Sequence, residues 1–342
     1  MKKKIINIIK IVAFILFGVI IFYLVYKDFN FSNLWNELKT LNYWFFIIAF
    51  IFAILSHISR SIRWQMLIDS KENKTGFFST FLAVLNGYLV NLAVPRAGEI
   101  SRCAIVSNYS KIPFSKVVGT MASERIIDVI VMLLLTVFVF FLQAPQMKQF
   151  LENNPGFYDN FHKFVNPITI SIAFIALAIF CILLFFIAKG KFSKRKIFQK
   201  IANFINGFWQ GLINLKNLQK PIRFILLSFA IWTCYFFEFY FCFLSFPGEL
   251  STLNILVAIT TFITCSYGVL APTPNGLGAY HFIIIQMLLV YGISESSASS
   301  FALIVHGMQT FFIIILGIFS LIFIPFLKKK TQLLENSISE EN

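Results

Sequence analysis

The stretch Tyr88-Leu-Val-Asn-Leu-Ala-Val-Pro-Arg-Ala-Gly-Glu99 decides the fold, because a proline and charged residues interrupt an apolar segment there. The segment before the break, residues 77–94, is long enough to cross a bilayer. A complete crossing would place the basic residues that follow Pro95 outside the cell, against the positive-inside rule. A segment that enters from the cytoplasm, turns at Pro95 and returns along residues 97–109 removes this conflict. The stretch therefore predicts a re-entrant helical hairpin.

The composition around this break is that of a membrane protein. Of the 342 residues, 58% are hydrophobic and 13% are charged, and the mean hydropathy is +0.78. Soluble domains carry about 25% charged residues, so part of the surface of this chain has to face lipid. We expect an all-α fold, a polytopic transmembrane helix bundle over residues 1–330 with a short acidic cytoplasmic tail at 331–342. The candidate apolar segments are residues 5–26, 43–59, 77–94, 121–142, 168–188, 222–246, 253–271, 277–293 and 301–326.

The basic residues behind the net charge of +14 gather between the apolar segments. Clusters at residues 2–10, 60–74 (with Arg60 and Arg63), 189–223 and 328–330 predict cytoplasmic loops, and both termini in the cytoplasm of a bacterial-type inner (plasma) membrane. Since these residues lie in separate loops and not on one face, no nucleic acid partner is expected. Residues 198–218 combine helical apolar spacing with basic residues, which predicts an amphipathic helix along the inner leaflet.

A second break, Tyr267-Gly-Val-Leu-Ala-Pro-Thr-Pro-Asn-Gly-Leu-Gly278, separates the segments 253–271 and 277–293. Charge does not decide whether these are two full crossings or a re-entrant hairpin from the outside. The hairpin is favoured because the break frees backbone groups that lipid cannot satisfy, so the turn must be buried in protein or face a wet cavity. Two breaks entering from opposite sides predict an inverted repeat with a substrate site near the bilayer midplane. The residues expected to shape the second turn are Pro272, Pro274, Gly276, Gly278 and the following His281.

Charged residues open the segment 121–142 and need partners at membrane depth. Glu124 and Asp128 are four residues apart, on one helix face, with Arg125 beside them. The first break supplies the expected partners. Such a cluster either pins the hairpin or binds an anionic headgroup through arginine, whose planar guanidinium suits phosphate, and both roles are compatible. The predicted headgroup site is Arg96, Glu99, Arg102, Glu124, Arg125 and Asp128, with Asn91, Pro95 and Gly98 shaping the first turn.

Three further polar residues lie in apolar surroundings. Glu238 sits near the middle of the segment 222–246, and His306 lies in the last segment. Each has either a structural hydrogen-bonding role or a place in a proton or polar relay, and His281 is a similar case beside the second turn. The five cysteines have no CxxC spacing and lie mostly in apolar runs, so we expect no metal site and no cofactor.

Three ordered elements, Asn91-Leu-Ala-Val-Pro-Arg-Ala-Gly-Glu99, Ser123-Glu-Arg-Ile-Ile-Asp128 and Pro272-Thr-Pro-Asn-Gly-Leu-Gly278, resemble motifs of one family. The family is the lysylphosphatidylglycerol synthase transmembrane region, or flippase-like, family, and the resemblance covers most of the chain. Asn275 stands where the family usually has glycine, and His281 where many members have an acidic residue. The resemblance implies handling of an anionic membrane lipid, such as a phosphatidylglycerol derivative or a polyprenyl-phosphate-linked intermediate. Lysyl transfer, which belongs to a separate cytoplasmic domain in two-part members, is not expected from this chain alone.

The favoured function is therefore that of a flippase-like lipid transporter and not of an enzyme. One alternative is a polyprenyl-linked membrane glycosyltransferase, which usually holds a metal with paired carboxylates on its first outer loop. That loop offers Asp28, with Glu37 distant in sequence. The other alternative is a non-transporting accessory subunit of cell-envelope machinery. Metal dependence separates the first alternative from a transporter, and lipid movement by purified protein in vesicles separates the second. The sequence predicts no oligomeric state.

Overall fold

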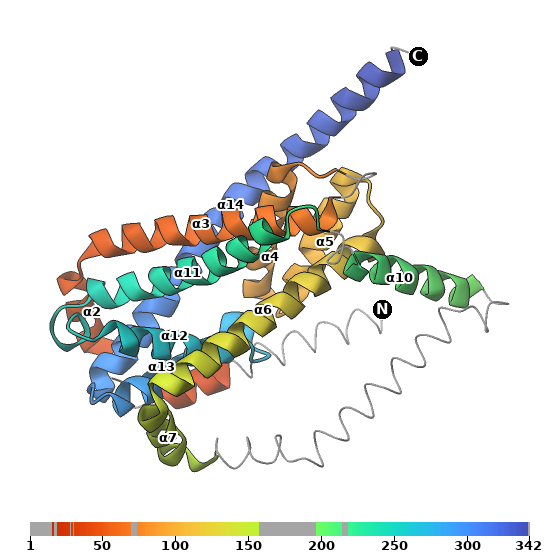
Figure 1. Ribbon diagram of the computed structural model, residues 1–342. Helices are drawn as coiled ribbons and strands as arrows, with labels where there is room; N and C mark the ends of the chain where they lie inside the picture. Colours follow the sequence, from red (N-terminus) through yellow and green to blue (C-terminus); the bar gives the residue numbers. More distant parts are fainter. Residues whose placement is uncertain are drawn as a thin grey trace, which may run out of the picture.

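The computed structural model describes residues 16, 19–27, 29, 31–69, 74–156, 196–213 and 218–340, and all regular secondary structure in these ranges is helical (Figure 1). This confirms the all-α expectation. The predicted segment 168–188 and the first part of 5–26 lie outside the described residues. In chain order the α-helices are α2 (Phe31–Thr40), α3 (Tyr43–Ile68), α4 (Phe77–Ala93), α5 (Ala97–Ser110), α6 (Phe114–Leu142), α7 (Ala144–Asn153), α10 (Lys196–Ile213), α11 (Pro221–Ser245), α12 (Ile255–Val269), α13 (Ala279–Val290) and α14 (Glu295–Glu340), with short 3-10 helices η1 (Gly248–Leu250) and η2 (Pro274–Gly276).

Within the described residues, four helices are long and apolar enough to cross a membrane: α3, α6, α11 and the Glu295–Leu327 part of α14. Three of these helices extend beyond the apolar segments predicted from the sequence. α3 continues to Ile68 instead of ending at residue 59, α6 begins at Phe114 instead of residue 121, and α14 continues to Glu340 through the predicted tail. The C-terminal part of α14 projects away from the bundle (Figure 1).

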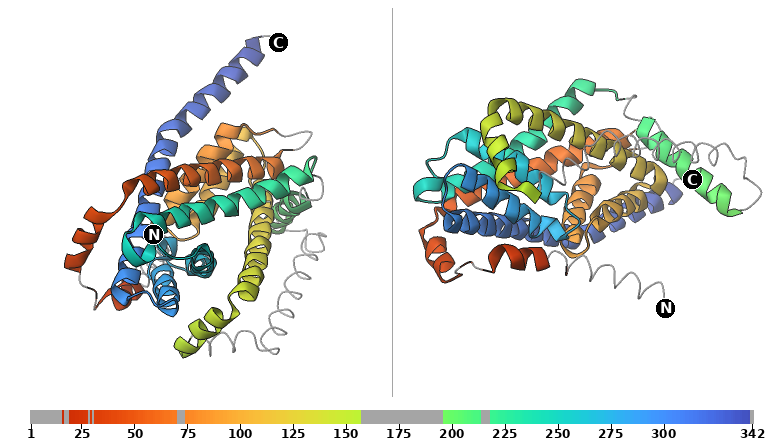
Figure 2. Two further views of the ribbon diagram at one scale, coloured as in Figure 1. Left: turned by 60° about the vertical axis from the view of Figure 1, so that its left-hand side comes forward. Right: turned by 90° about the horizontal axis from the view of Figure 1, so that it is seen from below.

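Helices α3 and α11 lie side by side and run antiparallel (Figures 1 and 2). The Asn42 N–H just before α3 donates to the carbonyl of Ser245 at the end of α11 (2.8 Å). Deeper in the pair, Arg63 Nη1 donates to Ser228 Oγ at 3.1 Å. The end of α3 also reaches the start of α6, where Trp64 Nε1 donates to Thr120 Oγ1 at 3.2 Å. The start of α6 is also covered by α10, the described part of the predicted amphipathic helix.

Helices α4 and α5 form the first helical hairpin, which reverses direction at residues 94–96. Gly87 on α4 and Gly98 on α5 let the two backbones approach closely, since a Cβ atom on Gly98 would collide with the Gly87 carbonyl oxygen. Pro95 cannot continue α4, because it lacks the N–H that the next helical hydrogen bond needs. The sequence thus dictates both the position of the turn and the tight contact between its arms.

Helices α12 and α13 form the second helical hairpin, which reverses through η2. Gly268 on α12 packs on the backbone of Tyr280 on α13, where an added Cβ would lie 2.7 Å from the Tyr280 Cα. Gly276 and Gly278 have φ angles of 76° and 83°, a region that residues with a side chain rarely adopt. The chain therefore turns here at the glycines and prolines that mark the break in the sequence.

The two hairpins are set in different cores. The second lies in the largest hydrophobic cluster, where rings of α11 meet α14 and Phe243 stacks on Phe301 with centroids 4.2 Å apart. The first lies in a smaller cluster that includes Trp64, Cys103 and Val117. The candidate site lies between the two hairpins.

Candidate functional site

A cavity of about 480 Å³ lies where the two hairpins meet, lined by residues of both. Arg96 at the first turn donates from Nη2 to the carbonyl oxygen of Leu270, just after α12, at 3.0 Å. The remaining wall comes from α3, α6, α11 and α14. Small-molecule sites commonly have volumes of about 300–1,000 Å³, so the cavity is large enough for a lipid headgroup.

Many of the predicted site residues line this cavity, although they are far apart in sequence. Those in its wall are Asn91, Pro95, Arg96, Gly98, Glu99, Arg102, Arg125, Asp128, Glu238 and His306. The predicted residues Glu124, Pro272, Pro274, Gly276, Gly278 and His281 are not among the lining residues. Of the second turn, Thr273 and Asn275 reach the wall instead.

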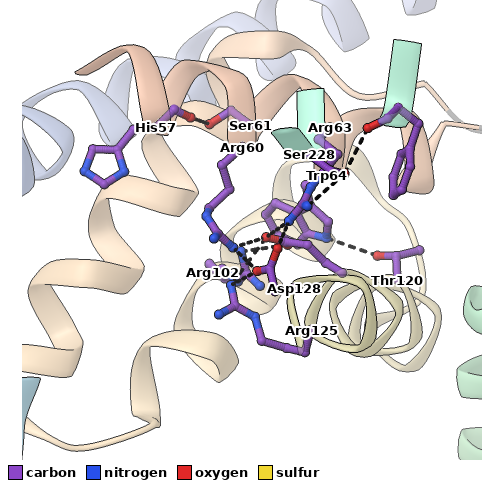
Figure 3. A network of polar contacts seen from close by, with 12 residues as sticks. His57, Arg60, Ser61, Arg63, Trp64, Arg102, Thr120, Arg125, Asp128 and Ser228 are labelled. Atoms are coloured by element: carbon purple, nitrogen blue, oxygen red, sulfur yellow. Dashed lines mark hydrogen bonds and ion pairs between the residues drawn. The ribbon is translucent and has the colours of Figure 1, made fainter. Parts of the chain in front are cut away.

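Glu124 on α6 is the centre of a buried ionic cluster, and its side chain is fully buried. Figure 3 shows how Arg60, Arg102 and Arg125 of this cluster gather around Asp128. Arg102 of the first hairpin pairs with it through Nη1 at 3.0 Å. Its other guanidinium partners are Arg60, Arg63 (3.4 Å) and Arg125 (3.3 Å). The structure thus joins the first hairpin to α6 through one carboxylate, as the spacing of the charges suggested.

Asp128, one helical turn after Glu124, is the second carboxylate of the cluster. It pairs with Arg63 Nη2 at 2.5 Å and Arg60 Nη1 at 2.9 Å, and lies 3.9 Å from Arg125 Nη2. Within this cluster four guanidinium groups therefore face two carboxylates, which leaves a surplus of positive charge beside this part of the cavity wall, while the carboxylates of Glu99 and Glu238 lie in the wall outside the cluster. Such a surplus favours an anion in the adjoining cavity.

Sequence reasoning missed Arg60 and Arg63, because basic residues after an apolar run usually belong to a cytoplasmic loop. Both are buried on α3, at 3% and 0% exposure. The feature of the sequence that could have indicated their burial is the helical spacing of apolar residues, which continues through Trp64, Leu67 and Ile68. All three of these residues are buried. A helix that continues this far carries the two arginines, three residues apart, on one face toward α6.

Two tyrosines next to the cluster were also missed. Arg60 Nε donates to Tyr235 Oη at 3.1 Å, and the hydroxyls of Tyr235 and Tyr88 are 2.8 Å apart. Tyr88 lies on α4 and Tyr235 on α11, so this chain of hydrogen bonds joins three helices along the cavity wall. Neither tyrosine carries a charge pattern that would have marked it in the sequence.

Arg96 and Glu99 line the cavity, but the structure does not bring them into the ionic cluster. Arg96 is exposed and bonds only the Leu270 carbonyl in the described part of the chain. Glu99 Oε2 is buried without a hydrogen-bond partner among the described residues. The backbone at Arg96 is left-handed, with φ 65°, and this reversal directs α5 so that Arg102 reaches Glu124 while Arg96 does not.

The second turn is surrounded by neutral hydrogen-bonding groups. His306 Nε2 lies 3.1 Å from the Asn275 carbonyl oxygen, and Tyr280 Oη donates to Gln309 Oε1 at 3.1 Å. His281 does not reach the cavity, but its Nδ1 accepts the backbone N–H of Gly278 at 3.2 Å. Asn275 has a left-handed backbone with φ 50°, which asparagine tolerates better than most residues that have side chains. This tolerance explains why asparagine can stand where glycine was expected.

Glu238 on α11 lines the cavity, and no hydrogen bond or ion pair of its carboxylate is recorded among the described residues. It lies in the same wall as Trp232, whose buried Nε1–H has no partner within the described ranges. The relay expected for Glu238 and His306 has no continuous hydrogen-bonded path among the described side chains, and both residues remain candidates.

Several buried N–H groups of the wall are left without a partner in the described structure. They include Nε and Nη2 of Arg102 and Nε of Arg125. Unpaired buried donors are costly, so these groups are suited to a polar ligand or to water. Apolar side chains complete the wall: Val129, Met132, Phe262, Phe312 and Ile313. A cavity with cationic and apolar parts can take both ends of an amphiphile.

An all-helical bundle with four spanning-length apolar helices and a polar cavity between two broken helical hairpins defines a multi-pass membrane protein. The sequence matches the model of the lysylphosphatidylglycerol synthase TM region over residues 8–317, and the chain belongs to that family. It is 26% identical over 281 residues to a UPF0104 membrane protein of Methanocaldococcus jannaschii, which covers 75% of this chain and 78% of the relative. A UPF0104 membrane protein of Pyrococcus horikoshii is 22% identical over 277 residues, covering 75% and 80%. No solved structure matches the chain significantly.

Proposed function

We propose that the protein is a flippase-like transporter that moves an anionic phospholipid across the membrane, with the headgroup held in the cavity between the hairpins. The observation that carries the proposal is the buried surplus of guanidinium groups beside unpartnered N–H donors in the cavity wall. Arginine binds phosphate through two parallel hydrogen bonds, and it does so most strongly away from water. The family membership supports the same lipid class.

The apolar part of the cavity wall supports a lipid over a soluble anion. Val129 and Met132 lie on α6 directly after the charged residues, and Phe312 and Ile313 face the cavity from α14. A free phosphate would gain nothing from these side chains, whereas the glycerol and first acyl carbons of a lipid would be buried against them. The wall thus matches a charged headgroup joined to an apolar chain.

We further propose that both hairpins are re-entrant and enter from opposite sides. The first hairpin packs near the start of α6, where Cys103 Sγ contacts the Val117 carbonyl, while beyond the second hairpin Tyr291 donates to Gln143 at the end of α6 (3.1 Å). At about 1.5 Å per residue, the 17 residues of α4 and the 12 of α13 fall short of a core of about 30 Å. Turns that meet between the two ends of α6 support entry from opposite faces.

A vesicle assay tests the transport proposal. Purified protein is reconstituted with a fluorescent anionic phospholipid, and lipid movement is followed by quenching the outer leaflet. We expect Arg125→Ala and Arg96→Ala to abolish movement while the protein still inserts and stays folded. The control is Arg223→Ala, an exposed arginine at the start of α11 away from the cavity. Full activity of both cavity variants would remove the anion-site proposal.

The same preparation separates the alternatives. A glycosyltransferase would lose activity with a metal chelator and would consume a sugar donor, whereas lipid movement by the proposed transporter needs neither. An accessory subunit would be folded and yet move no lipid. Topology is tested by labelling: a cysteine at Lys111, after α5, should react only from the cytoplasm, and one at Thr252, before α12, only from outside. Labelling of Lys111→Cys from outside would exclude the first re-entrant hairpin.

A further inference from the structure

The ionic cluster has a buried side and a cavity side. Arg63 and Glu124 are fully buried, and neither lines the cavity. Arg102 and Arg125 line the cavity and carry three N–H groups, Nε and Nη2 of Arg102 and Nε of Arg125, that have no partner in the part of the chain that the structure describes. Arg125 is the most accessible of the four arginines, with 41% of its side chain exposed. An anion in the cavity can therefore reach Arg60, Arg102 and Arg125 of the cluster, which all line its wall.

Asp128 is the carboxylate of the cluster that faces the cavity. Its side chain is 11% exposed and lines the wall, whereas Glu124 is sealed off by its guanidinium partners. The contact between Asp128 and Arg125 is the loosest ionic contact of the cluster, at 3.9 Å. Val129 and, one helical turn after Asp128, Met132 supply the apolar part of the wall on α6. Asp128 thus lies between the arginines and the place for the lipid's apolar part.

We infer that Asp128 is an internal counter-anion that competes with the lipid phosphate for Arg125 and Arg60, and so sets the affinity for anionic headgroups. This inference rests on the proposed function. A fixed carboxylate beside the phosphate lowers the net positive charge that the headgroup meets, which weakens binding and speeds release. A transporter needs this balance, because a phosphate held by the arginines of the wall without a competing carboxylate beside it would dissociate too slowly.

The replacement Asp128→Asn tests the idea, since it removes the charge but keeps an oxygen that can accept from Arg63. The full chain is placed in nanodiscs of zwitterionic lipid, and the binding of a fluorescent short-chain phosphatidic acid is measured against a fluorescent phosphatidylcholine. We expect Asp128→Asn to bind phosphatidic acid about tenfold more tightly, with phosphatidylcholine unchanged. We also expect slower movement of phosphatidic acid in vesicles, because release becomes limiting.

A second variant keeps the inference testable if Asp128→Asn does not fold. Val129 lines the cavity and is 47% exposed, so Val129→Glu adds a carboxylate there without breaking an ion pair. It should weaken the binding of phosphatidic acid relative to the matched neutral variant Val129→Gln. Unchanged or weaker binding by folded Asp128→Asn, or equal binding by the two Val129 variants, would overturn the inference. If the unaltered protein shows no preference for phosphatidic acid over phosphatidylcholine, the proposed function itself fails.

Discussion

The two helical hairpins reverse direction in similar ways but are held by different chemistry. The first is fixed by charge: Arg102 reaches Glu124 at 3.0 Å, and its guanidinium also lies over the Trp64 ring, 4.6 Å from the centroid. The second is fixed by neutral groups and rings, such as the pair His281 and His306 with centroids 4.6 Å apart. The difference teaches that the ionic contacts and the neutral contacts around the cavity are divided between its two halves, and only the first half has the charges that the proposed headgroup site needs.

The side chains that cap the helices after the two turns, α5 and α13, also differ between the hairpins. In the first hairpin, Asn91 Oδ1 accepts the backbone N–H of Gly98 at 2.7 Å. In the second, His281 Nδ1 accepts the N–H of Gly278 at 3.2 Å. An amide does not titrate near neutral pH, whereas an imidazole does. The cap of the first hairpin therefore does not depend on pH, whereas the cap of the second hairpin is a titratable side chain.

The largest effect is expected at Glu124, because the first hairpin depends on this single carboxylate. Glu124→Gln would leave four buried guanidinium groups with only Asp128, and should lower the free energy of unfolding by about 3–5 kcal/mol. Thermal unfolding in detergent measures the change. Glu238→Gln is the matched control near the second hairpin, and should change stability little because no ion pair of Glu238 is recorded among the described residues. Equal losses in both variants would break the comparison.

The next largest loss of stability is expected from substitutions at the glycines where the two arms of each hairpin come close together. Gly98→Ala places a methyl group against the Gly87 carbonyl, and Gly268→Ala places one 2.7 Å from the Tyr280 Cα. Each should lower the free energy of unfolding by about 1–3 kcal/mol, as overpacking does. Gly307→Ala is the control, since an added Cβ there meets nothing within 4 Å. Melting temperatures near the original for all three would show that the hairpins separate easily.

The positions of the helices and breaks could be predicted because apolar length, proline and glycine act locally. The structure bears out helical segments close to the predicted ranges on both sides of each break. The ionic cluster was predicted only in part. Arg60 and Arg63 depend for their burial on carboxylates about sixty residues away, and a local pattern does not show such a partner.

Arg96 and Glu99 were expected as possible partners of the α6 charges, and the structure places them in the cavity wall but outside the ionic cluster. The left-handed backbone at Arg96 turns this residue toward Leu270, and Arg102, six residues further along, faces Glu124. The side-chain direction at a turn depends on one φ angle, which composition does not determine. The cap formed by His281 was hidden for the same reason, because it depends on the conformation of Gly278.

A smaller effect is expected from acidification, and only in the second hairpin. An Nδ1 that accepts a hydrogen bond must be unprotonated, so protonation of His281 removes the cap of α13 and adds a positive charge at a helix N-terminus. The folded turn needs the unprotonated imidazole, whereas an exposed imidazole in the opened turn takes up a proton at about pH 6.5. The stability of this turn should therefore fall by about 1 kcal/mol or more as the pH drops from 7.5 to 5. Tyr26, Tyr280 and His306 are the titratable groups in ring contact with it.

Hydrogen exchange between pH 7.5 and 5 measures this difference between the hairpins. Exchange at the start of α13, corrected for the intrinsic pH dependence, should become faster, while exchange at the start of α5 should not. His281→Gln provides a non-titrating acceptor and should remove the pH effect. If α5 responds as much as α13, or if His281→Gln still responds, the titratable cap is not the cause.

The smallest effect is expected where both turns place a non-glycine residue in the left-handed region. Arg96→Gly relieves backbone strain at φ 65° but loses the exposed hydrogen bond to Leu270, and Asn275→Gly relieves less strain because asparagine tolerates this conformation. We expect stability changes within about 0.5 kcal/mol, with Arg96→Gly the more favourable of the two. Lipid movement should nevertheless fall in Arg96→Gly, because the guanidinium in the cavity wall is lost. Melting temperatures and the vesicle assay on the same samples separate the effect on backbone strain from the effect on lipid movement. If Arg96→Gly is stable and moves lipid normally, Arg96 shapes the turn but does not bind the lipid. Anion binding would then rest on Arg102 and Arg125.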